Sequence, residues 1–140
     1  MVRYKVDQAY RRNSVATATP LGLIVMLYDG LAVNLARAER SLAVASGAES
    51  ARFLKKAQDI ICELMGSLDF EKGGEIARNL FRVYEYMNYR LIQANLRRDP
   101  AVVAEVRGLV LQLKEAWEEA ERKLGRTRGG EGDLALGGKA

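Results

Sequence analysis

Apolar residues recur at alternating steps of three and four along most of this 140-residue chain. This spacing is typical of amphipathic α-helices, because one face of a helix returns every 3.6 residues. Four segments carry the pattern, and short breaks containing glycine, proline or helix-capping residues separate them. The pattern therefore predicts four helices.

The first predicted helix begins at Thr19 and Pro20, an N-cap residue followed by proline in the first helical position. It ends at Ser46 and Gly47. Its apolar stripe consists of Leu21, Ile24, Tyr28, Leu31, Leu35, Ala38, Leu42 and Ala45.

The second helix is predicted to use Ser50 as its cap, and residues 69–74 separate it from the third. The fourth opens with Asp99 and Pro100, which repeat the cap-and-proline pair, and ends at Gly125. The predicted inner stripes are Leu54, Ala57, Ile61, Leu64 and Leu68, then Ile76, Leu80, Val83, Met87, Leu91 and Ala94, then Val102, Val106, Leu109, Leu113, Ala116, Ala120 and Leu124.

Short connections force neighbouring helices to run antiparallel. We therefore predict an all-α fold, an antiparallel up-down four-helix bundle over residues 19–124. Residues 1–18 lack a sustained period and are predicted to form an N-terminal arm. Residues 125–140 are rich in glycine and poor in apolar residues, which predicts a disordered tail.

The inner stripes leave many apolar residues unassigned, although a bundle helix needs an apolar arc of only about 100°. A wider arc predicts a further surface to cover, which could be a client, a second subunit or the chain's own arm. Alternatively, the aromatic residues among them could complete the core or lie at its rim. The second seam consists of Phe81, Tyr84, Asn88, Ile92 and Asn95 on the third helix and Val103, Val110 and Trp117 on the fourth.

Single residues inside the helices add smaller expectations. Gly30, Gly66 and Gly108 each cost up to about 1 kcal/mol relative to alanine, so they should allow either close helix approach or room for a bound segment. Asp29 could cap, pair with a cation on another helix or face solvent, and a structural partner is favoured. Cys62 has no ligand set around it and is expected to be a small, buried or half-buried residue.

The composition limits the chemistry that the chain can perform. Histidine is absent and there is one cysteine, so the commonest general base, the commonest metal ligand and any internal disulfide are missing. We therefore expect no enzyme activity and no cofactor. The net charge of +4 lies mainly at the two ends, which argues against nucleic-acid binding.

The chain starts with polar residues and has no run of about 20 apolar residues. These features predict a cytoplasmic protein that does not insert into membranes.

Several short segments resemble, in order, those of the FliS family of flagellin export chaperones. They lie between about Tyr10 and Leu124. The segments are Ala18-Thr19-Pro20, Met26-Leu27-Tyr28-Asp29-Gly30, Ala57-Gln58-Asp59-Ile60-Ile61, residues 67–77, Tyr84-Glu85-Tyr86-Met87 and Ala94-Asn95-Leu96.

The resemblance implies a cytoplasmic chaperone with an antiparallel four-helix core. Such a protein binds the disordered C-terminal segment of flagellin, prevents premature polymerisation and helps deliver flagellin to the flagellar type III export apparatus. Other flagellar export proteins are further possible partners. The resemblance also implies that the N-terminal segment can occupy the groove until the client displaces it.

Together, the second seam and the resemblance predict a partner-binding groove covered by the arm. The expected partner-binding residues are Tyr10, Val15, Leu27, Phe81, Tyr84, Asn88 and Trp117. The rival hypothesis is a self-associating structural or adaptor protein whose second seam forms a homodimer. For the export chaperone, the expected state in isolation is a monomer or a weak homodimer.

Overall fold

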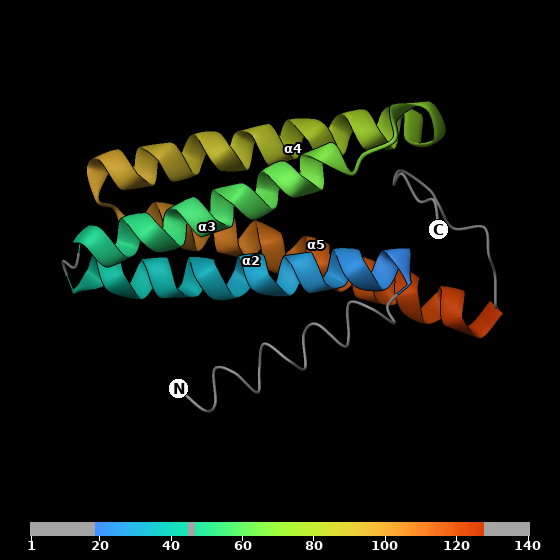
Figure 1. Ribbon diagram of the computed structural model, residues 1–140, viewed down its shortest axis with the longest axis horizontal. Helices are drawn as coiled ribbons and strands as arrows, with labels where there is room; N and C mark the ends of the chain where they lie inside the picture. The colour runs from blue at the N-terminus through green and yellow to red at the C-terminus, as the bar shows by residue number, and fades with distance from the viewer. Residues whose placement is uncertain (1–18, 45–46, 128–140) are drawn as a thin grey trace.

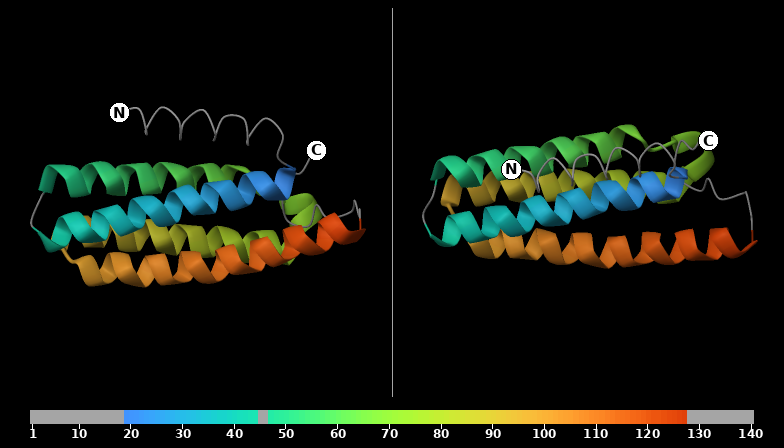
Figure 2. Two further views of the ribbon diagram at one scale, coloured as in Figure 1. Left: turned by 90° about the horizontal axis from the view of Figure 1, so that it is seen from below. Right: turned by 60° about the horizontal axis from the view of Figure 1, so that its bottom comes forward.

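The computed structural model describes residues 19–44 and 47–127. They form four helices, α2 (Pro20–Ala43), α3 (Gly47–Gly66), α4 (Phe70–Arg97) and α5 (Pro100–Thr127), and each reverses the direction of the one before it (Figure 1). Helix α2 packs against α3 and α5, and α4 packs against the same two helices. The predicted antiparallel four-helix bundle is thus confirmed, with α2 and α4 at diagonal positions (Figure 2).

Two of the three predicted helix caps are confirmed, and one is wrong. The Thr19 hydroxyl accepts a hydrogen bond from the Gly22 amide at 3.0 Å, and the Asp99 carboxylate accepts one from the Ala101 amide at 3.0 Å. Helix α3, however, begins at Gly47 rather than after Ser50. The Ser50 hydroxyl donates to the Gly47 carbonyl at 2.9 Å, so it lies inside the first turn and does not cap it.

The predicted helix end at Gly125 is also wrong, because α5 continues to Thr127. A single glycine weakens a helix by only about 1 kcal/mol, and no proline follows to stop this one. The predicted arm and the rest of the predicted tail lie outside the described residues.

Helix α2 supplies the largest share of the core. Seven of the eight residues in its predicted stripe are buried, and the eighth, Ala45, is outside the described residues. By length and composition, α2 is also the one described helix that could cross a membrane. In the bundle its apolar stripe packs against the neighbouring helices instead.

The inner face of α5 differs from the prediction. Val103, Val110 and Trp117, which were assigned to the second seam, are buried. Leu109 and Leu113 are only half-buried, and Ala116 is exposed. The predicted residues Val102 and Val106 are buried as well, so the face that packs in the bundle combines residues of both apolar stripes and includes the large Trp117 ring.

Helix α4 begins with a separate turn. The Asp69 carboxylate accepts hydrogen bonds from the amides of Glu71 and Lys72 at 3.0 and 3.1 Å, which starts the turn. Gly74 then has φ 50° and ψ −123°, so the regular helix starts again only after it. An L-residue with a side chain is strained in this conformation. Two residues later, Ile76 is 59% exposed and not in the core as predicted, while Ala77 is buried.

We expect Gly74→Ala to destabilise the bundle by about 1–3 kcal/mol, because alanine must adopt the same positive φ. Gly73→Ala is the matched control, since Gly73 lies in the preceding turn and Gly74 is the only described glycine with positive φ. Urea unfolding followed by circular dichroism measures both. Equal destabilisation by the two substitutions would contradict this assignment of strain.

Candidate functional site

Two of the predicted partner-binding residues belong to the core. Tyr84 is 1% exposed and Trp117 is 8% exposed. The Tyr84 hydroxyl shares a 2.7 Å hydrogen bond with the Tyr28 hydroxyl, and the Tyr28 and Trp117 rings lie 6.5 Å apart. The prediction that Tyr84 and Trp117 line a surface groove is therefore corrected, because both side chains pack inside the bundle.

The paired hydroxyls are held in their neutral form. Burial raises the pKa of Tyr84, and so do the hydrogen bond and the charge that an ionised Tyr28 would place beside it. Burial also raises the pKa of Tyr28, partly offset by hydrogen bonds from Tyr84 and Trp117. An ionised tyrosine in this apolar interior would lose its hydration, so both groups keep their protons.

The remaining predicted residues come from different parts of the chain. Leu27 is half-buried on α2, three residues before Gly30, where an added Cβ would lie 3.4 Å from the Ile60 side chain of α3. Leu27 therefore lies on the side of α2 that faces α3. Tyr10 and Val15 lie outside the described residues.

Phe81 and Asn88 lie on the side of α4 nearest α3. Phe81 packs edge-on against the Phe70 ring, with centroids 5.8 Å apart. The Asn88 amide nitrogen is 3.8 Å from the Cys62 sulfur of α3, and its amide oxygen is buried with no partner among the described residues. Cys62 itself is exposed, contrary to the prediction.

Helix α4 carries most of the exposed apolar side chains in the described part of the chain. Six of the ten large apolar residues that are exposed there belong to α4. At 100° per residue, four apolar residues of this helix fall within an arc of about 80° on its outer side. We call this set the α4 strip; it consists of Phe81, Tyr89, Ile92 and Leu96.

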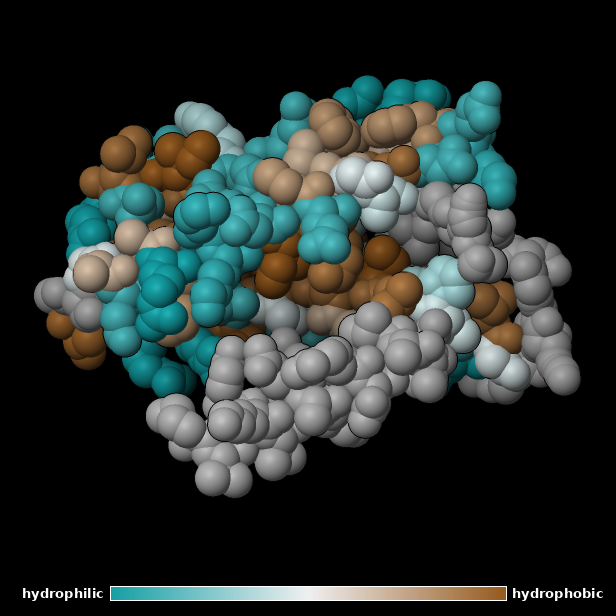
Figure 3. Space-filling view, in the orientation of Figure 1, coloured by the Kyte–Doolittle hydropathy of each residue, from teal (hydrophilic) through white to brown (hydrophobic). Residues whose placement is uncertain are grey.

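The strip is solvent-facing over most of its length. Tyr89 is 58% exposed, Ile92 50% and Leu96 77%, while Phe81 is half-buried. Figure 3 shows hydrophobic residues gathered over the C-terminal end of α4 and, separately, in the middle of the same face over α2 and α3. On this face, therefore, apolar residues lie over the C-terminal end of α4 and also over α2 and α3.

The other side of α4 is tied to α5 by polar contacts. The Glu105 carboxylate accepts a hydrogen bond from the Tyr86 hydroxyl at 2.6 Å and two from the Arg90 guanidinium at 2.7 and 3.2 Å. These partners lower the pKa of Glu105, with Arg90 the larger cause. The contacts fix the rotation of α4 against α5 and leave the strip facing outward.

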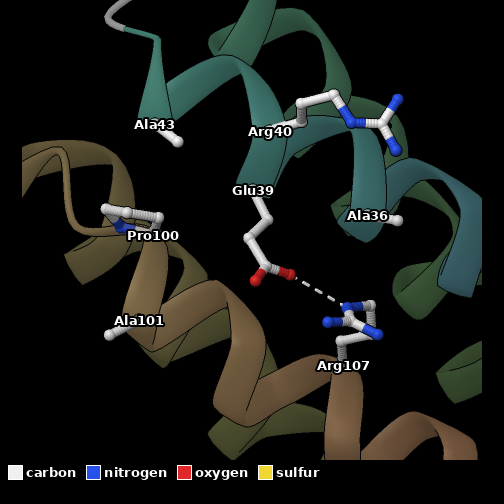
Figure 4. Close-up of a pocket in the computed structure, with 7 residues that line it drawn as sticks. All are labelled: Ala36, Glu39, Arg40, Ala43, Pro100, Ala101 and Arg107. Atoms are coloured by element: carbon white, nitrogen blue, oxygen red, sulfur yellow. Dashed lines mark hydrogen bonds and ion pairs between the residues drawn. The ribbon is translucent and has the colours of Figure 1, made fainter.

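The helix pair α2 and α5 offers only a shallow depression. Figure 4 shows the Glu39–Arg107 ion pair, 3.0 Å long, which joins the two helices and lines the depression together with Arg40 and small residues. Further along, the Lys114 ammonium lies 2.9 Å from the Asp29 carboxylate, which confirms the structural partner favoured for Asp29. No group of three potential metal ligands occurs in the parts of the chain that the structure describes.

A family model described as "Flagellar protein FliS" matches residues 3–124, most of the chain. The chain belongs to the FliS family. It is 44% identical over 112 residues to the flagellar secretion chaperone FliS of Salmonella typhimurium (strain LT2), covering 79% of this chain and 83% of the relative. It is 36% identical over 127 residues to FliS of Bacillus subtilis (strain 168), covering 91% and 94%.

A third FliS relative, named flagellar secretion chaperone FliSB, comes from Pseudomonas aeruginosa. It is 39% identical over 122 residues, which cover 84% of this chain and 97% of the relative. The resemblance inferred from short motifs is thus confirmed over most of the length of these three relatives. Membership of a chaperone family also agrees with a non-enzymatic role.

The sequence prediction missed Tyr89 and Leu96 as surface residues. With Ile92 they are spaced by three and four, the same helical rule that identified the core. A second set with this spacing, turned outward from the Met87 and Leu91 stripe, was therefore readable in the sequence.

The buried tyrosine pair of this FliS protein predicts a loss of stability in alkaline solution. A free tyrosine ionises near pH 10. The pKa values of Tyr28 and Tyr84 are both raised in the folded state, so in alkaline solution the unfolded chain loses protons that the folded chain keeps. The stabilisation is full below about pH 10 and declines above it, by up to about 1.4 kcal/mol per pH unit for each tyrosine.

Urea unfolding between pH 8 and 11 tests this for the wild type and for Tyr28→Phe combined with Tyr84→Phe. The double variant should lose less stability over this range, because it has the same lysines but lacks both titrating hydroxyls. Parallel declines for the two proteins would exclude the tyrosine pair as the cause.

Proposed function

We propose that this chain is a cytoplasmic export chaperone that binds the disordered C-terminal segment of flagellin. In this role it prevents premature polymerisation and helps deliver flagellin to the flagellar type III export apparatus. Membership of the FliS family supports the flagellar secretion role. The observation that carries the binding site is the exposed α4 strip.

The strip suits a client that folds as it binds. A disordered segment with an apolar stripe can bury that stripe along a helix face, in the helix-in-groove mode. Such coupled folding typically buries about 1,000–3,000 Å² and spends several kcal/mol on ordering the segment. The interaction can therefore cover a large surface and still be released for export without nucleotide.

The spacing within the strip matches this mode of binding. Tyr89, Ile92 and Leu96 are separated by one helical turn each and are not required by the core, since Met87, Leu91 and Ala94 fill the buried face. Asn88 lies at the edge of the strip nearest α3 and can supply an amide contact to a client backbone.

A homodimer through the α4 strip is the rival function, because a second copy could cover the same apolar side chains. Sedimentation velocity at several protein concentrations separates the two. A monomer at micromolar concentration that binds the flagellin segment supports the chaperone. A stable dimer that excludes the segment would support self-association.

We expect Ile92→Ser and Leu96→Ser each to weaken binding of a flagellin C-terminal peptide by about tenfold, which corresponds to about 1.4 kcal/mol of lost apolar contact. Isothermal titration calorimetry gives the affinity and the negative heat-capacity change expected for apolar burial. Both side chains are exposed, so the free energy of unfolding should change little.

Leu111→Ser is the matched control, because Leu111 is 43% exposed on α5, outside the strip. It should leave the affinity unchanged. Wild-type affinity in both strip variants would remove α4 from the site, and an equal loss in the Leu111 variant would point to a different binding face.

A further inference from the structure

A chain of hydrogen bonds runs from α5 across α4 to the exposed strip. Glu105 accepts from Arg90, and the Arg90 Nη1 atom donates to the Gln93 amide oxygen at 2.7 Å. The Gln93 amide nitrogen then donates to the Tyr89 hydroxyl oxygen at 3.1 Å. We call this series of hydrogen bonds, from Glu105 through Arg90 and Gln93 to Tyr89, the relay. It joins a carboxylate on α5 to an exposed ring on α4.

The relay has only one possible polarity. A guanidinium has donors and no acceptor, so the Gln93 atom that faces Arg90 must be its carbonyl oxygen. The amide NH₂ of Gln93 must then point at Tyr89. Because the Tyr89 oxygen accepts this bond, its own O–H proton is directed away from Gln93.

No described residue accepts the Tyr89 proton. Glu105 holds Arg90 in place by two of its guanidinium nitrogens, and the Arg90 side chain is only 23% exposed. Arg90, which donates to Gln93, is therefore held in place. At the other end of the relay, the hydroxyl proton of Tyr89 remains available, and Tyr89 is 58% exposed.

We propose that the Tyr89 hydroxyl is a hydrogen-bond donor site for an acceptor oxygen of the bound client, and that Gln93 sets this polarity. The proposal rests on the proposed function, which places the client on the α4 strip. The acceptor is a carboxylate or a backbone carbonyl. Carbonyls are free in extended chain and in the last turn of a helix, so a helical client would end near Tyr89.

Tyr89 then combines two kinds of contact. Its ring lies with Ile92 and Leu96 on the apolar strip, and its hydroxyl adds a directional contact that apolar packing lacks. A segment of equal hydrophobicity without an acceptor at this point would bind less tightly, because the hydroxyl would lose its water without gaining a partner.

The decisive variant is Gln93→Glu, which replaces one NH₂ group by oxygen. The carboxylate still accepts from Arg90, but it also accepts the Tyr89 proton and turns the hydroxyl inward. Titration calorimetry with the flagellin C-terminal peptide should show about a three- to tenfold loss of affinity for Tyr89→Phe and a similar loss of affinity for Gln93→Glu. The affinity of the double variant should be no lower than that of either single variant.

Gln112→Glu is the matched control, because Gln112 is exposed on α5 outside the relay and gains the same charge. It should bind as the wild type does. Near-wild-type affinity in Tyr89→Phe or in Gln93→Glu overturns the proposal, as does an additive double variant or an equal loss in the control. These outcomes leave the proposed function intact, whereas a wild-type protein that fails to bind the peptide overturns both.

Discussion

Helix α2 buries its apolar stripe against its neighbours. How much of the core this one helix supplies determines which apolar residues the other helices can leave exposed. Ten of its residues are buried, against five each in α3 and α4. Fully burying one leucine or isoleucine stabilises the fold by about 1.5–3 kcal/mol, so the α2 stripe holds the bundle together. With this much of the core supplied by one helix, α4 can support a second apolar face without loss of the fold.

The diagonal arrangement explains how α4 is held. Helices α2 and α4 pack mainly on α3 and α5 rather than on each other, yet the hydroxyls of Tyr28 and Tyr84 meet at the centre. Neutral, paired hydroxyls satisfy each other where water is absent. A phenylalanine pair would pack similarly but would not fix the distance and direction between the two helices.

The sequence predicted the fold closely because the strongest signals are local. The Thr19 cap, the Pro20 start and the α2 stripe each follow from residues near one another in the chain. The candidate site was harder to predict. Tyr84 is at the position where an aromatic ring could face inward or outward, and only the partner on α2 decides it. On α5, two adjacent stripes were both apolar, and the buried face takes residues from each, with Trp117 packed beside Tyr28.

The same long-range dependence governs the exposed face of α4. Met87 and Leu91 point into the core, and Tyr89 and Ile92 follow two and one positions later. A shift of one residue would turn the helix by about 100°, burying the strip and exposing the core residues. The Gly74 break, the left-handed Arg98 cap and the Glu105 contacts fix the ends and the rotation of α4. The register of α4 that completes the core therefore also exposes the strip that we propose as the client-binding surface.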